Sequence, residues 1–149
     1  ALAADPQDWA NRKEATSAEG WARRQSLLAM SGDGFPIYST CEMLPEDKIA
    51  IKYRYSAFIP YPSEFDGVLR ALGIDTLIIT GVATSTCCES TGRDAAMWGY
   101  RTVMVSDGNA DQTDDLHNHT LGKFLVTFGD VQSTDDLLAK LQAPAKIGT

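Results

Sequence analysis

The chain has 149 residues, of which 44% are hydrophobic and 22% are charged, and this balance is typical of a globular domain with one sizeable core. Its formal net charge is −7, and no cluster of Lys and Arg interleaved with aromatic residues is present, so we expect no nucleic-acid partner. No apolar run approaches the roughly 20 residues of a membrane-spanning helix, so we expect no membrane association.

The three cysteines, Cys41, Cys87 and Cys88, are an odd number without the spacing of a disulfide framework. Free thiols indicate a reducing compartment. The first residues, Ala1–Asp5, lack the basic and apolar segments of a secretion signal. These observations together predict a cytoplasmic protein.

Strand and helix patterns alternate along most of the chain, with Gly and Pro at many of the boundaries. This alternation predicts an α/β fold in which helices cover both faces of a parallel sheet, and we expect a single domain over residues 1–149. In chain order the patterns predict a helix over 17–30, a turn at 44–47, a strand over 48–53, a helix from 65 that ends at Gly73, a buried strand over 75–80, a helix over 87–98 that ends at Gly99, a strand over 101–106 closed by a turn at 107–109, a helix over 113–128, a short strand over 129–132 and a helix over 135–141 capped by Thr134.

The segment after the 75–80 strand has the parts of an activated nucleophile. The apolar run stops at Gly81, a polar turn follows, and Thr86-Cys87-Cys88-Glu89 fits a capping box with Thr86 as the N-cap. Cys87 would then lie in the first helical turn, where unpaired amides and the helix dipole favour the thiolate, the reactive form of cysteine. The alternative is a buried structural cysteine, because free cysteine is among the most buried residue types.

A second candidate, Lys52, lies near the end of the 48–53 strand. Ligands of open parallel sheets bind outside the carboxyl ends of the strands, so the fold places Lys52 and Cys87 on the same rim. The alternative for Lys52 is a solvated lysine at a strand end, since lysines are mostly exposed.

Several motifs in order resemble one known family, the isochorismatase-like cysteine hydrolases. The resemblance extends over about residues 34–141, roughly three quarters of the chain. The motifs are Lys52-Tyr53-Arg54-Tyr55-Ser56-Ala57-Phe58, then Leu72-Gly73-Ile74-Asp75 leading through the apolar run to Thr80-Gly81-Val82-Ala83-Thr84, then Cys87, Thr91-Gly92-Arg93-Asp94-Ala95, Gly99-Tyr100 and Val105-Ser106-Asp107.

The resemblance implies a Rossmann-like three-layer sandwich and a triad of aspartate, lysine and cysteine, with Cys87 as nucleophile and Lys52 as its charged partner. It also implies a cis peptide at Val82–Ala83, with the amides of Ala83 and Cys87 directed at an oxyanion. The implied activity is hydrolysis of a C–N bond in a small linear or ureido-type amide through a thioester. Vinyl-ether hydrolysis is not implied, because that branch of the family works without this thiol.

The resemblance further implies a homo-oligomer that acts on a small-molecule amide without a cofactor, in which the pocket is completed by neighbouring subunits. Tyr55 and Phe58 are candidates for lining that pocket, and packing around the strand end is the alternative role for both.

One departure concerns the triad aspartate, which in the family ends a first strand. Too little sequence precedes Lys52 for that β-α-β unit, so we expect the unit to be absent from the sequence shown. Asp5-Pro6-Gln7-Asp8-Trp9 echoes the aspartate motif, an echo that we interpret as accidental. The alternative function is therefore a catalytically inactive or oligomerising remnant of the family.

The two histidines could suggest a metal site. His117 and His119 are two positions apart in a predicted helix, so their side chains diverge and are poorly placed to chelate one ion. We therefore expect no metal at this pair.

Overall fold

The computed structural model describes residues 14–29, 32, 36–59 and 64–143. The chain divides into two compact units, Ala1–Ile49 and Ala50–Thr149. In the first unit, helix α2 (Ala18–Leu28) begins where the Ser17 hydroxyl accepts a hydrogen bond from the Gly20 amide. This N-cap confirms the helix that the sequence predicts in this region.

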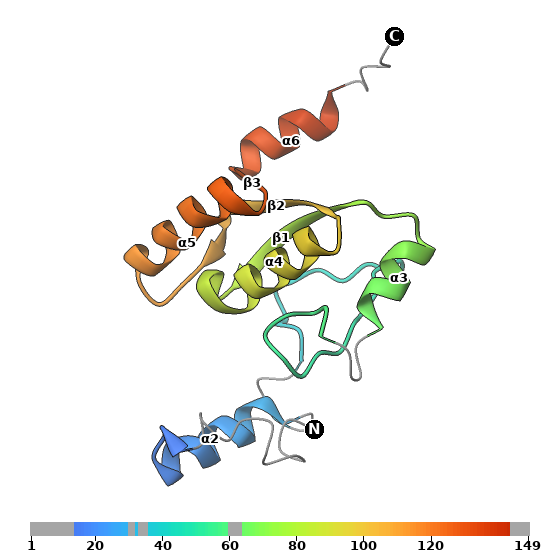
Figure 1. The fold of residues 1–149 in the computed structure, drawn as a ribbon. Coiled ribbons are helices and arrows are strands. Elements are labelled where there is room, and N and C mark those ends of the chain that lie inside the picture. Colours follow the sequence, from blue (N-terminus) through green and yellow to red (C-terminus); the bar gives the residue numbers. More distant parts are fainter. Residues whose placement is uncertain (1–13, 30–31, 33–35, 60–63, 144–149) are drawn as a thin grey trace. The chain divides into compact units, whose positions relative to one another are not determined.

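The second unit contains a three-stranded sheet in the order β1-β2-β3, and both strand pairs are parallel. Helices connect the strands, which confirms the α/β class with a parallel sheet. The strands are β1 (Thr76–Val82), β2 (Arg101–Ala110) and β3 (Asp130–Gln132); the helices are α3 (Phe65–Ala71), the π-helical turn η2 (Thr84–Cys88), α4 (Glu89–Met97), α5 (Asp114–Thr127) and α6 (Thr134–Gln142) (Figure 1).

The principal core of this unit lies between the sheet and helices α4 and α5 (Figure 1). Gly92 of α4 permits the close approach of α5, because a Cβ atom at this position would lie 2.6 Å from Cε2 of Phe124. The apolar side chains that form this core are Ile79, Cys88, Met104, Leu121 and Phe124.

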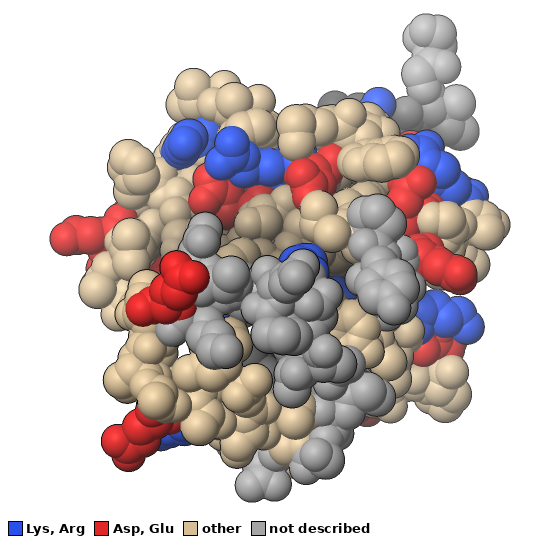
Figure 2. Space-filling model, turned by 60° about the horizontal axis from the view of Figure 1, so that its bottom comes forward, with Lys and Arg blue, Asp and Glu red and all other residues tan. Residues whose placement is uncertain are grey.

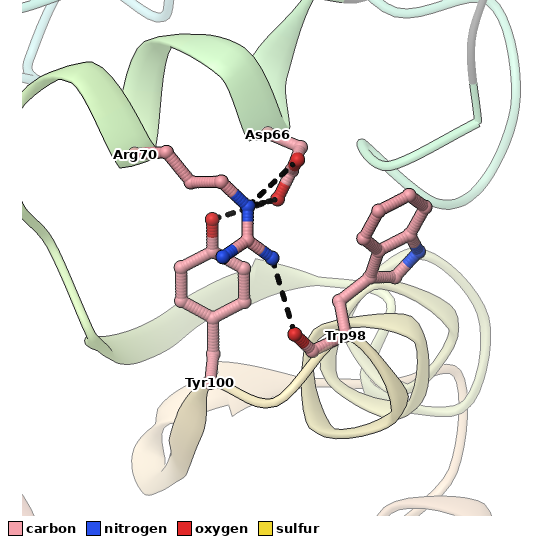
Figure 3. Close-up of polar contacts among 4 residues, drawn as sticks. All are labelled: Asp66, Arg70, Trp98 and Tyr100. Carbon is pink, nitrogen blue, oxygen red and sulfur yellow. Dashed lines mark hydrogen bonds and ion pairs between the residues drawn. The ribbon is translucent and has the colours of Figure 1, made fainter.

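A second cluster joins α3 to the beginning of β2 and the end of α4. Phe58, Leu69, Ala95 and Tyr100 are buried together in it. A polar network, shown in Figure 3, lies beside this cluster. In it the Tyr100 hydroxyl donates to Asp66 Oδ1 at 2.7 Å, and Arg70 of α3 donates to the same carboxylate at 3.0 Å and to the Trp98 carbonyl at 3.2 Å.

The register between β1 and β2 shifts near their carboxyl ends. Ile79 lies opposite Met104, but Gly81 lies opposite Asn109, so β2 carries extra residues at this point. The Asn109 amide group closes the gap, since its Nδ2 donates to the carbonyls of Ile79 at 2.9 Å and Val105 at 2.7 Å. The predicted turn at 107–109 is therefore wrong, because the strand continues through this segment as an irregular bulge.

Two further expectations about strands are wrong. Residues 48–53 form no strand, because an alternating pattern makes a strand only where a partner supplies hydrogen bonds, and the sheet of the described residues consists of β1, β2 and β3. The strand β1 is mostly exposed, with Ile79 buried but Ile78 45% and Val82 73% exposed. This exposure arises because β1 pairs only with β2 within the described sheet and so lies at its edge.

The ends of the helices follow the sequence closely. Gly73 and Gly99, which follow α3 and α4, have φ angles of +69° and +89°, where glycine has no steric penalty. Thr113 caps α5 by accepting from the Leu116 amide. The cap of α6 is a correction, since Ser133 rather than Thr134 accepts from the Asp136 amide.

The described helices include none that is both long enough and apolar enough to cross a bilayer. On the face drawn in Figure 2, Lys and Arg side chains lie among Asp and Glu side chains rather than in a patch of their own.

Candidate active site

The chain reverses direction sharply at the carboxyl end of β1. Gly81 has a φ of +123°, a conformation that residues with a side chain rarely adopt. The next peptide bond, Val82–Ala83, is cis, and it is the bond that the resemblance singles out. The π-helical turn η2 then begins directly at Thr84.

The structure corrects the expected capping box. Helical backbone begins at Thr84 rather than at Cys87, and the extended residue Ala83 is the N-cap of η2. Neither η2 nor α4 has a side-chain cap, so Thr86 and Glu89 do not form the predicted reciprocal pair. The π turn replaces the cap, because it continues into α4 and the carbonyl of Ala83 accepts from the amides of Thr86 and Cys88.

The two adjacent cysteines have different surroundings. Cys87 is partly exposed, whereas Cys88 is 4% exposed and belongs to the core between the sheet and α5. Burial is the main reason that the pKa of the Cys88 thiol rises to about 11. Cys88 is thus a structural cysteine that stays protonated near neutral pH, and Cys87 is the accessible thiol of the pair.

Several backbone amides of η2 already have partners. The amides of Thr86 and Cys88 donate to the Ala83 carbonyl at 3.1 and 3.2 Å. The Ser85 amide donates to Asp111 Oδ2 at 2.6 Å. The two amides that the resemblance assigns to an oxyanion, those of Ala83 and Cys87, are not among these three engaged donors.

Two side chains from β2 and α5 hold the beginning of η2. Asp111 follows β2 and accepts from the Ser85 amide, and these hydrogen bonds to Ser85 are the main reason that the pKa of Asp111 is lowered. His117 Nδ1 of α5 lies 2.9 Å from the hydroxyl oxygen of Thr84, which is fully buried.

Neither Asp111 nor this role of His117 is predicted by the sequence patterns described above. The position of Asp111 could have been found from the sequence, because Asp111 comes directly after one strand, β2, just as the turn that contains Cys87 comes directly after another, β1. The carboxyl ends of parallel neighbouring strands meet at one rim.

Lys52 lies in a segment without helix or strand. Its Nζ donates to the carbonyls of Arg54 at 3.0 Å and Tyr55 at 3.1 Å, so the ammonium folds back onto its own loop. Lys52 is exposed, as the alternative of a solvated lysine predicts, but its positive charge opposes the effect of burial by lowering the pKa of Cys88.

The remaining candidates fall into three groups. Phe58 is 6% exposed and packs edge-on against Phe65, with ring centroids 5.2 Å apart, so its surroundings favour the packing role. Tyr55 is partly buried, and its part in a pocket stays a prediction. Within the described residues no group of His, Cys, Asp or Glu could hold a metal ion, and the segment Asp5–Trp9 lies outside those residues.

Comparison with known proteins places this geometry in a family. The model of the isochorismatase domain matches residues 10–136. A solved cysteine hydrolase from Pseudomonas syringae pv. phaseolicola has 25% sequence identity and a TM-score of 0.75, over 87% of this chain and 66% of that one. The chain belongs to the isochorismatase family.

Two curated relatives are amidohydrolases by name. The ureidoacrylate amidohydrolase RutB of Pseudomonas savastanoi pv. phaseolicola is 36% identical over 111 residues, which are 74% of this chain and 44% of that protein. The maleamate amidohydrolase of Pseudomonas putida is 27% identical over 125 residues, which are 82% of this chain and 58% of that protein. The match therefore spans less than two thirds of either relative's length.

Proposed function

We propose that this protein is a cysteine-dependent amidohydrolase that cleaves a C–N bond in a small linear or ureido-type amide. Cys87 is the nucleophile and Lys52 is the cation that favours its thiolate form. The curated relatives support this class of reaction, because both are named for hydrolysis of small amides, ureidoacrylate and maleamate.

The proposed reaction has two stages. The Cys87 thiolate adds to the amide carbonyl carbon, and a C–S bond forms as the carbonyl becomes an oxyanion. The oxyanion then collapses, the C–N bond breaks, and ammonia or an amine leaves with the proton that the thiol released. Water hydrolyses the resulting thioester to the acid and restores the thiol.

The turn after β1 provides the features that this reaction needs. Cys87 lies in η2 directly after the reversal at Gly81 and is partly exposed. The amides of Ala83 and Cys87 are the donors proposed for the oxyanion, and one well-placed donor of this kind contributes about 3–4 kcal/mol to the transition state.

The observation that carries the proposal is the accessible thiol of Cys87 in the turn that follows β1, with Lys52 placed to act on the neighbouring Cys88. The loop of Lys52 contains no regular structure, yet its ammonium lies close enough to lower the pKa of the neighbouring Cys88. In a chain of this family, an accessible thiol after a parallel strand, with a lysine whose loop is hydrogen-bonded to the helix that follows that thiol, supports nucleophilic catalysis.

The proposal predicts different consequences for the two adjacent cysteines. Cys87→Ala should lower amide turnover by roughly 1,000-fold or more, because it removes the nucleophile. Cys88→Ala should retain most of the turnover, since this thiol is buried and protonated. Turnover is measured as release of ammonia from a panel of small linear and ureido amides that includes ureidoacrylate and maleamate.

The control is the alkylation of Cys87 by iodoacetamide near neutral pH, followed by peptide mass spectrometry. Rapid alkylation of Cys87, relative to the exposed Cys41 of the same chain, is the expected result. Equal rates at the two cysteines, together with no turnover of any amide in the panel, would contradict the proposal and favour the non-catalytic alternative.

A further inference from the structure

The position of Lys52 depends on contacts made by a loop rather than on regular structure. Residues 50–59 contain no helix or strand, so no ladder of backbone hydrogen bonds fixes this segment. Lys52 binds only carbonyls of its own loop in the hydrogen bonds described above. The contacts that attach this loop to α4 therefore help to determine where the ammonium lies relative to Cys87.

The hydroxyl of Thr91 makes this attachment. Thr91 lies in the first turns of α4, and its Oγ1 donates to the carbonyl of Cys87 at 2.7 Å. The same oxygen accepts from the backbone amide of Ala57 at 3.2 Å. One hydroxyl thus joins the residue of the proposed nucleophile to the loop of Lys52, across 34 positions of sequence.

Only the second of these two bonds is unusual. A threonine within a helix often donates to the carbonyl four residues earlier, and that bond alone would indicate nothing beyond local helix structure. A hydroxyl has both a donor and acceptor sites, and here the acceptor side serves a distant loop. The hydrogen bond from Ala57 is what distinguishes Thr91 from an ordinary helical threonine.

The neighbouring residues make the attachment specific. Phe58 is buried with Ala95 of α4 and with Tyr100, so the end of the loop is held by apolar contact. The Ser56 hydroxyl accepts from the Phe58 amide at 3.1 Å and fixes the turn between them. Phe58 thus holds the loop against α4, and Thr91 sets where the backbone before Phe58 lies relative to Cys87.

We propose that Thr91 is a positioning residue whose hydroxyl holds the Lys52 loop in register with the Cys87 backbone, and so keeps the ammonium beside the thiol. This inference rests on the proposed roles of Lys52 and Cys87 in amide hydrolysis. Thr91 touches neither the substrate nor the reacting sulfur, and it acts through the loop. Its loss should therefore reproduce part of the loss of Lys52.

The test is a double-mutant cycle between Thr91→Val and Lys52→Met in the full chain. The pH midpoint of iodoacetamide alkylation of Cys87 is measured by peptide mass spectrometry, a readout that needs no substrate. Lys52→Met should raise the midpoint, because a nearby cation favours the thiolate. Thr91→Val should raise it by about half as much, and should add almost nothing in the Lys52→Met background.

Two outcomes would overturn the inference in different ways. If Lys52→Met raises the midpoint but Thr91→Val does not, or if the effect of Thr91→Val persists undiminished without Lys52, Thr91 does not act through that lysine and the proposed function stands. If Lys52→Met leaves the midpoint unchanged, the role of Lys52 in the proposed function fails, and the inference fails with it.

Two further variants guard against loss of folding. Thr91→Ser keeps the hydroxyl and should return the midpoint most of the way to that of the unmodified chain. Thr91→Ala removes the hydroxyl without adding bulk and should shift the midpoint in the same direction as Thr91→Val. Urea unfolding of each variant establishes that it is folded in the pH range of the alkylation measurement.

Discussion

Adjacent residues in one turn can have opposite chemical roles, and Cys87 and Cys88 illustrate this. The helical backbone rotates by about 100° from one residue to the next, so neighbours face different surroundings. Cys88 points into the core beside Ile79 and Phe124, and burial raises its thiol pKa to about 11. Cys87 remains partly exposed.

The raised pKa of Cys88 has a consequence for stability in alkali. Folding keeps this thiol protonated, whereas the unfolded chain releases the proton near the ordinary value of 9.0. The free energy of unfolding should therefore fall as the pH rises from about 9 towards 11. Cys88→Ala should lower the free energy of unfolding by about 1 kcal/mol at pH 7, where the thiol is neutral and well packed. The difference in the free energy of unfolding between the unmodified chain and the variant, called the gap below, should narrow with increasing pH.

Urea unfolding at a series of pH values from 7 to 11 measures this gap. A gap that stays constant over the series would show that Cys88 titrates alike in the folded and unfolded chain.

At the scale of elements, the approach of α4 to α5 determines the core beneath the site. The position of Gly92 in α4 leaves no room for a side chain, because Phe124 of α5 and Ile79 of β1 occupy the space that a Cβ would need. The helix that follows the nucleophile turn is therefore held close to the sheet by a glycine. This packing links the geometry of the turn to the stability of the core.

Gly92→Ala should destabilise the protein by about 1–3 kcal/mol, since the added methyl group would lie 2.6 Å from the Phe124 ring and would force the core to shift. The matched control is Gly122→Ala in α5, where nothing lies within 4 Å of an added Cβ. That substitution should stabilise the protein by about 0.5–1 kcal/mol through helix propensity. Thermal and urea unfolding of both variants check the contrast, and equal effects of the two substitutions would refute it.

At the scale of the whole molecule, carboxylates join segments that are distant in sequence. Asp66 joins α3 to Tyr100, the residue before β2; Asp107 of β2 accepts from Thr134 of α6; and Asp111, which follows β2, accepts from Ser85 of η2. Hydrogen bonds are the largest cause of the lowered pKa of each of these three groups. Their contribution to stability is therefore present above the ordinary carboxyl pKa and is lost as the pH falls through the lowered values.

The network of Figure 3 allows one of these contributions to be measured. The hydrogen bond from the Tyr100 hydroxyl is the largest cause of the lowered pKa of Asp66, ahead of the bond from Arg70. Tyr100→Phe keeps the buried ring and removes only this donor. It should be destabilising at pH 7 and less so at pH 3, because the contribution of this bond declines as the pH falls below the ordinary carboxyl pKa of 3.8 towards the lowered pKa of Asp66. Urea unfolding at both pH values tests this, and an equal loss at each would contradict it.

Local sequence predicted most elements and the candidate nucleophile. Glycines at 73 and 99 marked the ends of α3 and α4, and Thr113 marked the beginning of α5. The reversal after β1 and the position of Cys87 beyond it were also readable, because Gly81 interrupts an apolar run. These features depend on backbone preferences within a few residues, which sequence expresses directly.

Features that depend on partners could not be read in this way. The alternating pattern at 48–53 predicts a strand, yet whether a strand forms depends on a neighbour with free hydrogen-bonding groups. The residues from Thr86 match the pattern of a capping box, but the helical backbone begins two residues earlier, at Thr84, as a π turn without a side-chain cap. The anchors Asp111 and His117 lie 26 and 33 positions from the residues that they hold.

The sequence by itself determined the α/β class, the position of two adjacent cysteines after a strand, and the family of the protein. Tertiary structure alone decided which of two adjacent thiols is buried and which hydroxyl joins the loop of Lys52 to the backbone of Cys87. The physical reason is that burial, electric fields and long-range hydrogen bonds belong to pairs of segments. Their strength depends on distances that no single segment encodes.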